Sequence, residues 1–389
     1  MIMNDYLMKT YNRKKVAFQK GEGVYLWDTN NKKYLDTLSG LAVTSLGHAH
    51  PEIADVIHKQ SKILIHTSNA FVIQQQKILA KRLCMLAGME KAFFCNSGAE
   101  AVETAIKIAR KYGNDKKINN PKIIVMENSF HGRTMAALSA TGNDKVHQGF
   151  YPLLDGLLRV PYSDISAIEE LAAKDNSIVA ILLESIQGEG GVIIPDEGYL
   201  KKLRKICDNH KWLLMIDEVQ SGLCRTGKWF GFQHSSISPD VVTVAKALGN
   251  GIPIGACLAR NSAAEVLTPG SHGSTFGGNF LATTVAIKVL DIMKQQNLCG
   301  NARIMGKYFE EQLNKSLNKN LIKEIRCKGL MIGIELNTKC LHYVEEALEL
   351  GLVINVTKES IIRLLPPLII DKTHVDKIMM VLTKLIRET

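Results

Sequence analysis

Hydrophobic and polar positions divide the chain into three stretches with different patterns. Residues 16–38 alternate apolar and polar side chains between glycine and asparagine turn signals, which predicts a meander of two or three short strands. From Pro51, apolar residues at helical spacing alternate with short apolar runs typical of buried strands. After Asn279 the pattern changes to a smaller α+β part, with helices expected at 281–294, 301–317, 343–350 and 371–386 and strands near 325 and at 331–335 and 361–364. We therefore expect an N-terminal segment (1–50) packing against a small C-terminal domain (281–389), and a large domain between them (51–280).

The middle stretch predicts a mostly parallel sheet flanked by helices. We expect strands at 92–95, 122–125, 178–184, 212–217 and 241–245, and helices at 52–64, 74–86, 165–174 and 198–209, with a further helix beginning after Asn96. Strands and helices that alternate over about 200 residues are typical of parallel strands joined by right-handed crossovers. Ligands in such sheets bind beyond the carboxyl ends of the strands. Four side chains stand at those ends: Ser97, Glu184, Asp217 and Lys246.

Composition and charge narrow the class of protein. The chain has 389 residues, of which 46% are hydrophobic and 22% charged, as in an ordinary globular protein with a sizeable core. Its 48 basic and 38 acidic residues leave a net charge of +10, which is spread along the chain. The densest basic cluster, Arg13–Lys15, is short, and no basic run has interleaved aromatic residues. We therefore expect no nucleic-acid partner.

The sequence also bears on compartment and metals. No run approaches the roughly 18 apolar residues of a membrane span, and the start lacks the apolar core of a signal peptide. The eight cysteines form no C-x-x-C pair, which favours a reducing compartment. His48 and His50 have no carboxylate or thiol at ligand spacing, so we interpret their loop as structural and expect no metal. We predict a cytoplasmic protein without a membrane partner.

Lys246 is the most informative single residue. It directly follows the apolar run Val241–Ala245, and Gly249, Gly251 and Pro253 then interrupt regular structure. A lysine at the end of a buried strand has its pKa lowered by burial, which makes the neutral amine available as a nucleophile. The alternative is a lysine that marks the strand's exit to solvent.

Two further strand ends carry candidate chemistry. Residues Asn96–Glu100 open a helix, where unpaired N–H groups and the helix dipole attract anions and Gly98 allows close approach; the alternative is plain N-capping. Asp217 ends an apolar strand, and a buried carboxylate is costly unless it is paired. Its partner could be an arginine, a metal or a protonated ring nitrogen, or the carboxylate could cap the following turn.

Three more segments have both a functional and a structural interpretation. Phe130 and His131 offer a flat face beside the guanidinium of Arg133, or they are core residues beside a surface ion pair. The glycine-rich loop 271–279 carries hydroxyls that could close on a phosphate, or it is only a loop. Arg363 stands in an apolar frame, which suggests a buried guanidinium with an anionic partner.

One small molecule accounts for these features together. A phosphate, a flat ring, a ring nitrogen that needs a carboxylate and an aldehyde that needs a lysine are the parts of pyridoxal 5′-phosphate. Each motif is weak alone. The combination of the turn at Ser97–Ala99, Phe130, His131, Asp217 and Lys246 predicts this cofactor.

The chain closely resembles the class III (subgroup II) aminotransferases of fold type I over nearly its whole length. The resemblance is carried by motifs at residues 21–23, 46–51, 96–101, 130–133, 187–191, 217–220, 245–256 and 274–279. One departure is Ser185, where the family usually has proline; we expect it to change the stiffness of that loop rather than its chemistry. The resemblance implies an α/β fold with a mostly parallel seven-stranded sheet plus a smaller α+β domain.

The resemblance also implies roles for individual residues. Lys246 bonds to the cofactor aldehyde and then moves the proton, while Asp217 keeps the ring nitrogen protonated. Thr275 reaches the phosphate in the neighbouring subunit, which implies a homodimer with shared active sites. The implied cofactor-binding residues are Ser97, Gly98, Ala99, Phe130, His131, Asp217, Glu218, Val219, Gln220, Lys246 and Thr275. The implied substrate-binding residues are Arg133, Glu189, Ser274 and Arg363.

Within the class, the chain is most similar to the enzymes that move the δ-amino group of N2-acetyl-L-ornithine to 2-oxoglutarate. Arg133 then receives one substrate carboxylate, and Arg363 binds the second carboxylate of glutamate. We hypothesise that Glu189 covers Arg363 for acetylornithine and moves aside for glutamate. The alternatives are an ornithine, 4-aminobutyrate or succinyldiaminopimelate aminotransferase, an aminomutase, and a nucleotide-binding module without catalysis, which lacks the expected G-x-G-x-x-G.

Overall fold

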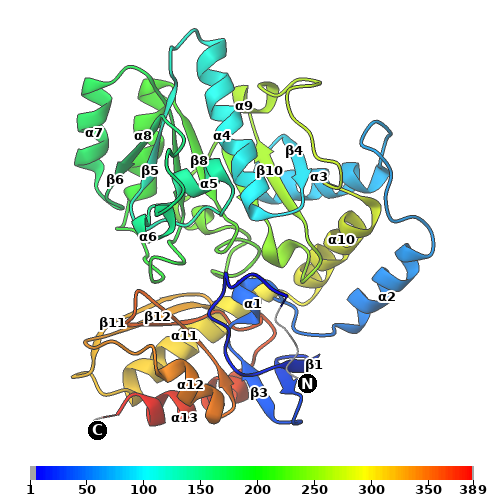
Figure 1. The fold of residues 1–389 in the computed structure, drawn as a ribbon, viewed down its shortest axis with the longest axis vertical. Helices are drawn as coiled ribbons and strands as arrows, with labels where there is room; N and C mark the ends of the chain where they lie inside the picture. Colours follow the sequence, from blue (N-terminus) through cyan, green and yellow to red (C-terminus); the bar gives the residue numbers. More distant parts are fainter. Residues whose placement is uncertain (1–5, 388–389) are drawn as a thin grey trace.

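A seven-stranded, mostly parallel sheet forms the centre of the upper part of the molecule in Figure 1, a computed structural model that describes residues 6–387. Its strands lie in the order β4-β10-β9-β8-β7-β5-β6, and within it only β10 runs antiparallel to its neighbours. The bounds are β4 Lys91–Cys95, β5 Lys122–Met126, β6 Leu157–Val160, β7 Ile178–Glu184, β8 Leu213–Asp217, β9 Val241–Val244 and β10 Gly255–Ala259. The predicted fold class is confirmed.

The central strands are buried on both faces because helices cover both sides of the sheet. Every residue of β7 and β8 is buried. Along β7, Ile181 and Leu183 belong to the core shared with α8 (Tyr199–His210), whereas Ala180 and Leu182 belong to the core shared with α4 (Gly98–Asp115). Continuous apolar runs are what a doubly covered parallel sheet requires.

Two strands of this sheet, β6 and β10, were not among the predicted elements. β10 has the sequence Gly-Ala-Cys-Leu-Ala, which lacks the β-branched and aromatic residues enriched in strands. It forms nonetheless because β9 and β4 supply hydrogen-bonding partners on both sides. Tertiary pairing therefore overrides a weak local propensity at this position.

Two smaller sheets lie in the lower part of Figure 1. The predicted meander is confirmed as β1 (Phe18–Glu22), β2 (Tyr25–Asp28) and β3 (Lys33–Asp36), and β13 (Leu352–Val353) pairs with β3. The other sheet has the order β11-β12-β15-β14, with bounds β11 Ile322–Lys328, β12 Met331–Leu336, β14 Asn355–Thr357 and β15 Ile361–Leu364. The domain boundaries at residues 50 and 280 stay a prediction.

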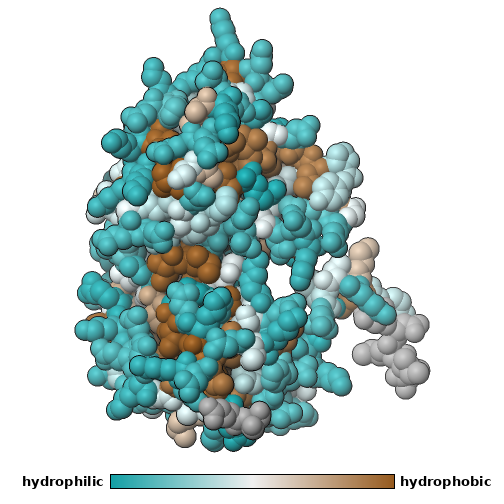
Figure 2. Space-filling model, turned by 90° about the vertical axis from the view of Figure 1, so that its left-hand side faces the viewer, coloured by the Kyte–Doolittle hydropathy of each residue, from teal (hydrophilic) through white to brown (hydrophobic). Residues whose placement is uncertain are grey.

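Helices make up most of the remaining chain. Besides α4 and α8, they are α1 Ser39–Ala42, α2 Pro51–Ser61, α3 Gln74–Ala87, α5 Met135–Ala140, α6 Asp144–His147, α7 Ile165–Lys174, α9 Ser262–Glu265, α10 Phe280–Gln295, α11 Leu298–Ser316, α12 Tyr343–Glu349 and α13 Lys372–Leu385, with short 3₁₀ turns η1 (Gly231–Ser235) and η2 (Lys246–Leu248). Among residues 6–387, no helix is both long and apolar enough to cross a membrane, and no three His, Cys, Asp or Glu side chains group as a metal site. The face in Figure 2 is mostly hydrophilic, with smaller hydrophobic patches.

Candidate active site

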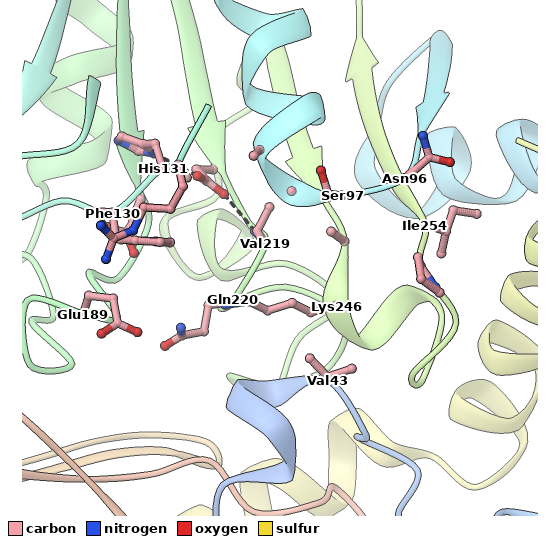
Figure 3. Close-up of a pocket in the computed structure, with 18 of the residues that line it drawn as sticks. Val43, Asn96, Ser97, Phe130, His131, Glu189, Val219, Gln220, Lys246 and Ile254 are labelled. Atoms are coloured by element: carbon pink, nitrogen blue, oxygen red, sulfur yellow. Dashed lines mark hydrogen bonds and ion pairs between the residues drawn. The ribbon is translucent and has the colours of Figure 1, made fainter. Parts of the chain in front are cut away.

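A cavity of about 470 Å³ opens at the carboxyl ends of the central strands, where the strand-end rule places ligands (Figure 3). Glu184 ends β7, Asp217 ends β8, and Lys246 follows β9. The cavity is lined by most of the residues predicted for the site, namely Ser97, Gly98, Ala99, Phe130, His131, Arg133, Glu189, Asp217, Val219, Gln220 and Lys246. Segments that are far apart in the sequence thus meet at one place.

Lys246 begins the short turn η2 with a left-handed backbone, φ 46°. Its side chain extends into the cavity in Figure 3, and its ammonium nitrogen makes no hydrogen bond or ion pair within residues 6–387. Burial lowers the pKa of Lys246, and the positive charge of Arg363 lowers it further, against the opposing effect of nearby carboxylates. The alternative of a lysine that simply leaves the strand for solvent does not fit these surroundings. The amine is positioned to act as a nucleophile or a base.

Asp217 is held in a fixed orientation by three hydrogen bonds. One carboxylate oxygen lies 2.8 Å from Nδ1 of His131, and the other accepts from the Thr243 hydroxyl at 3.1 Å and the Val219 N–H at 3.0 Å. Asp217 is 4% exposed and forms no ion pair with an arginine or lysine among the described residues. A buried carboxylate that faces a cavity without such a partner suits a cationic group on a ligand.

The N-terminus of α4 presents two free N–H groups to the cavity. The Ser97 hydroxyl accepts from the Glu100 N–H at 3.2 Å, and the Glu100 carboxylate accepts from the Asn96 N–H at 2.8 Å, so the predicted capping is present. The N–H groups of Gly98 and Ala99 donate to no acceptor within the described chain. Capping and anion binding are therefore compatible at this end of the 18-residue helix. Capping uses the N–H group of Glu100, and the N–H groups of Gly98 and Ala99 remain for an anion.

The close approach of Val219 also requires a glycine at position 98. A methyl group added there would lie 2.8 Å from Cγ1 of Val219, which is closer than side-chain carbons pack. Val219 follows Asp217 on the β8 loop and lines the same cavity. The absence of a side chain at Gly98 therefore lets the helix N-terminus and the carboxylate loop approach each other.

Arg363, on β15, is almost completely buried and has the anionic partner that its apolar frame predicts. Its Nη1 lies 2.7 Å from Glu189 Oε1 and 3.4 Å from Gln220 Oε1. Asn355 Oδ1 accepts from Nη2 at 2.8 Å and from Nε at 3.2 Å. Asn355 was not predicted; it stands directly opposite Arg363 in the β14–β15 pairing, a relationship that appears only once the sheet register is known.

Arg133 supplies a second cation at the same cavity. The side chain is exposed, and it forms no ion pair with a carboxylate among the described residues. Its guanidinium carbon lies 5.8 Å from the centroid of the Phe130 ring, a cation–π arrangement that places charge beside a flat apolar face. Arg133 is therefore free to receive an anionic group of a ligand.

Glu184 is a cavity residue that only the strand-end rule identified. Its carboxylate accepts from the N–H groups of Phe130 and Gly188, each at 2.9 Å. Burial raises the pKa of Glu184 from its ordinary 4.5 to about 7, while the charge of His131 opposes the shift. This carboxyl group therefore titrates near neutral pH beside the predicted nucleophile.

Four of the predicted residues do not line the cavity. Arg363 borders it through its contacts with Glu189 and Gln220, whereas Glu218, Ser274 and Thr275 lie elsewhere. The carboxylate of Glu218 is turned away and accepts from the N–H groups of Gly231 and Phe232, each at 2.9 Å, so we do not retain it as a cofactor-binding residue. The Ser274 hydroxyl accepts from the Asn96 side-chain amide at 3.2 Å, outside the cavity, and Thr275 is exposed. In a single chain these two hydroxyl residues do not complete the site.

The chain matches a known family model and curated relatives along nearly its whole length. The model described as Aminotransferase class-III matches residues 6–386. An acetylornithine aminotransferase of Nitrosomonas europaea is 54% identical over 98% of this chain and 97% of the relative. Acetylornithine aminotransferase 1 of Bordetella pertussis is 47% identical over 99% of this chain and 98% of the relative.

Solved structures show the same similarity in three dimensions. An ornithine aminotransferase from Toxoplasma gondii matches with a TM-score of 0.94 at 35% identity, covering 98% of this chain and 92% of that one. An acetylornithine aminotransferase from Elizabethkingia anophelis matches with a TM-score of 0.87 at 37% identity, covering 98% and 96%. The free N–H groups of Gly98 and Ala99, the cavity-facing carboxylate of Asp217 and the free amine of Lys246 fit the phosphate, ring nitrogen and aldehyde of one cofactor. The chain therefore belongs to the class III aminotransferases, and its cofactor is pyridoxal 5′-phosphate.

Proposed function

We propose that this chain transfers the δ-amino group of N2-acetyl-L-ornithine to 2-oxoglutarate, giving N-acetyl-L-glutamate 5-semialdehyde and L-glutamate, a step of arginine biosynthesis. The observation that carries the proposal is the 2.7 Å ion pair between Arg363 and Glu189, in a site that holds a second, unpaired cation at Arg133. The names of relatives at 47–54% identity support the choice of amino donor.

The residues around the cavity divide the binding of the cofactor among them. The N–H groups of Gly98 and Ala99 hold the phosphate, while Phe130 and Val219 enclose the ring. Asp217, oriented by His131, would accept a hydrogen bond from the ring nitrogen and keep that nitrogen protonated. When bound, pyridoxal 5′-phosphate supplies an aldehyde that takes up amino groups and a ring that withdraws electrons from the carbon losing its proton. Ser97 and Gln220 act beside these groups, Ser97 as the helix cap and Gln220 next to Arg363.

Lys246 performs the proton transfer. Its lowered pKa makes the neutral amine accessible, so the same nitrogen accepts a proton from the substrate carbon and returns it as an acid. A group that first accepts and then donates a proton needs a pKa near the working pH. Because this amine makes no hydrogen bond within the described chain, it is free to move as it accepts the proton and returns it.

Two cations and one movable carboxylate account for two unlike substrates. Acetylornithine has one carboxylate, which Arg133 receives, and Glu189 then neutralises Arg363. Glutamate and 2-oxoglutarate have two carboxylates, so Glu189 leaves Arg363 to the second one. Glu189 is partly exposed whereas Arg363 is 1% exposed, which makes Glu189 the mobile partner of the pair.

A homodimer with shared active sites is part of the proposal. Ile63, Phe71 and Val72, between α2 and α3, are strongly exposed, as is Phe276 in the loop before α10. The two segments touch, since the ring of Phe276 lies 5.4 Å from that of His66. An exposed apolar surface of this kind is typical of an interface. It lies beside Ser274 and Thr275, which then reach the acetylornithine and the phosphate in the partner's site.

We also propose a cytoplasmic enzyme, because all eight cysteines are unpaired thiols, as expected in a reducing compartment.

Dimerisation is tested by mixing Lys246→Ala and Thr275→Ala protomers. In a hybrid dimer, one of the two sites has an intact Lys246 and receives an intact Thr275. Activity should therefore rise on mixing above that of either variant alone, and no rise would contradict shared sites.

The amino donor is tested by kinetics with acetylornithine, ornithine, succinyldiaminopimelate and 4-aminobutyrate side by side, with 2-oxoglutarate as acceptor. We expect kcat/KM to be highest for acetylornithine, by at least about tenfold over ornithine and 4-aminobutyrate, because acetylornithine is the donor that the names of the relatives at 47–54% identity support. A higher value for ornithine would instead assign the chain to the activity named for the Toxoplasma gondii enzyme. Loss of visible absorbance on adding glutamate alone verifies the other half-reaction.

A further inference from the structure

Two buried hydroxyl groups link the loop that follows β7 to the loop that follows β8, and each loop supplies residues to the cavity. The Ser185 hydroxyl donates to the Ser221 hydroxyl at 3.0 Å, and Ser221 donates to Glu218 Oε2 at 2.8 Å. All three residues are at most 2% exposed. Glu218 is itself fixed, since its carboxylate accepts two backbone N–H groups of η1. Ser185 is thus tied through Ser221 to a rigid anchor.

The two joined loops carry the two residues that contact Nη1 of Arg363. Ser185 begins the segment that ends at Glu189, and Ser221 directly follows Gln220. Glu189 lies 2.7 Å and Gln220 3.4 Å from the same guanidinium nitrogen. The loops also touch at Gly188, where an added methyl group would collide with Oε1 of Gln220. A shift of either loop therefore displaces an acceptor of Arg363.

We propose that Ser185 is a positioning residue that holds Glu189 over Arg363 and so sets the discrimination between substrates with one carboxylate and substrates with two. Ser185 does not line the 470 Å³ cavity, so it acts through the loop and not by touching substrate. This inference rests on the proposed function. A buried hydroxyl–hydroxyl bond is a modest interaction, and it suits a contact that must tolerate movement of Glu189 at every turnover.

The Ser185→Ala variant removes the bond while leaving every cavity residue in place. We expect KM for acetylornithine to rise about fivefold, because Glu189 covers Arg363 less often, while KM for glutamate stays the same or falls. The ratio of the two kcat/KM values should therefore change about fivefold, or about 1 kcal/mol. Ser139→Ala is a matched control, since Ser139 is equally buried and hydrogen-bonded but contacts Met135 and Leu154 instead.

Ser221→Ala removes the other partner of the Ser185–Ser221 hydrogen bond. With two variants, the test does not depend on whether one of them folds. The ratio for Ser221→Ala should shift in the same direction. The double variant should be no worse than Ser221→Ala alone, because Ser221→Ala already lacks the Ser185–Ser221 hydrogen bond as well as the Ser221–Glu218 one. An unchanged ratio in folded, cofactor-loaded Ser185→Ala and Ser221→Ala enzymes would overturn the inference. If the proposed function itself were wrong, the wild-type enzyme would not accept acetylornithine. Assaying the wild type therefore distinguishes that result from an unchanged ratio in the variants.

Discussion

The guanidinium of Arg363 and the carboxylate of Glu189 form an ion pair of 2.7 Å at the point where the β15 strand of the smaller sheet meets the cavity of the larger one. The two side chains differ in exposure: the Arg363 side chain is 1% exposed, whereas the Glu189 side chain is 36% exposed. Asn355 holds the far side of the guanidinium. In the proposed function, the arginine is therefore a fixed cation whose charge the carboxylate of Glu189 covers or releases.

Arg363→Ala should separate the two half-reactions. Glutamate loses the cation that binds its second carboxylate, and we expect its kcat/KM to fall roughly 100-fold, while acetylornithine changes by less than about fivefold. Stopped-flow absorbance after adding each amino donor alone measures the two effects separately. Equal losses for both donors would show that Arg363 supports the fold of the site and does not select substrates.

Glu189→Ala should have the opposite selectivity. Arg363 then stays uncovered, so glutamate binding is retained while acetylornithine, which has no second carboxylate, meets an uncompensated buried cation. We expect kcat/KM for acetylornithine to fall about tenfold and that for glutamate to hold. The same stopped-flow assay serves, and Glu189→Gln distinguishes loss of charge from loss of packing.

Much of this site was predictable because its residues stand at strand ends in a parallel sheet. Asp217 and Lys246 follow apolar runs long enough to recognise, and the topology of such sheets brings those ends together. Glu218 shows the limit of that argument. It adjoins Asp217, but beyond the strand the side chains no longer alternate regularly, and its carboxylate is directed to N–H groups of η1.

What local pattern could not predict depends on pairing across long distances in the sequence. β10 has no strand-like composition and forms because β9 and β4 flank it. Asn355 reaches Arg363 only through the register of β14 and β15. The contact of Ser185 with Ser221 likewise joins the ends of two neighbouring strands, 36 residues apart in the sequence. A pattern within one segment contains no information on any of these three.

Lys246→Ala should abolish transamination without unfolding the protein. The amine makes no hydrogen bond within the described chain, so its loss costs little stability, whereas proton transfer at the substrate carbon has no substitute. We expect turnover to fall by at least about 10³-fold with a melting temperature of the cofactor-free protein within a few degrees of wild type. Circular dichroism and a coupled glutamate assay measure the two quantities, and normal transamination would refute the assigned site.

Glu184→Gln should alter the pH dependence of stability. Folding raises the pKa of Glu184 from 4.5 to about 7 through burial, so the folded state binds a proton more tightly than the unfolded chain does. The stabilisation linked to this proton is fully present below pH 4.5 and is lost as pH rises through 7, with an upper limit of about 3 kcal/mol. The unfolding free energy of the wild type minus that of the Glu184→Gln variant should therefore decrease between pH 4.5 and 7.

Urea denaturation of the cofactor-free enzymes across that pH range provides the measurement. Glu103→Gln is a useful reference, because Glu103 is a carboxylate that accepts backbone hydrogen bonds from Ala136 and Ala137 and does not line the cavity. Its difference from wild type is measured over the same pH range for comparison. A difference between wild type and Glu184→Gln that stays flat with pH would mean that Glu184 keeps an ordinary affinity for protons in the fold.

Gly98→Ala should weaken the binding of the cofactor by steric means. The new methyl group lies 2.8 Å from Cγ1 of Val219, so either the N-terminus of α4 or the loop after Asp217 must shift. The free N–H groups of Gly98 and Ala99 then no longer converge on one phosphate, and we expect the dissociation constant of pyridoxal 5′-phosphate to rise at least about tenfold. Fluorescence titration of the cofactor-free protein measures it. The double variant Gly98→Ala with Val219→Ala removes the collision and should recover part of the affinity. No recovery would show that the glycine is needed for its backbone freedom or for direct phosphate approach, and not for its contact with Val219.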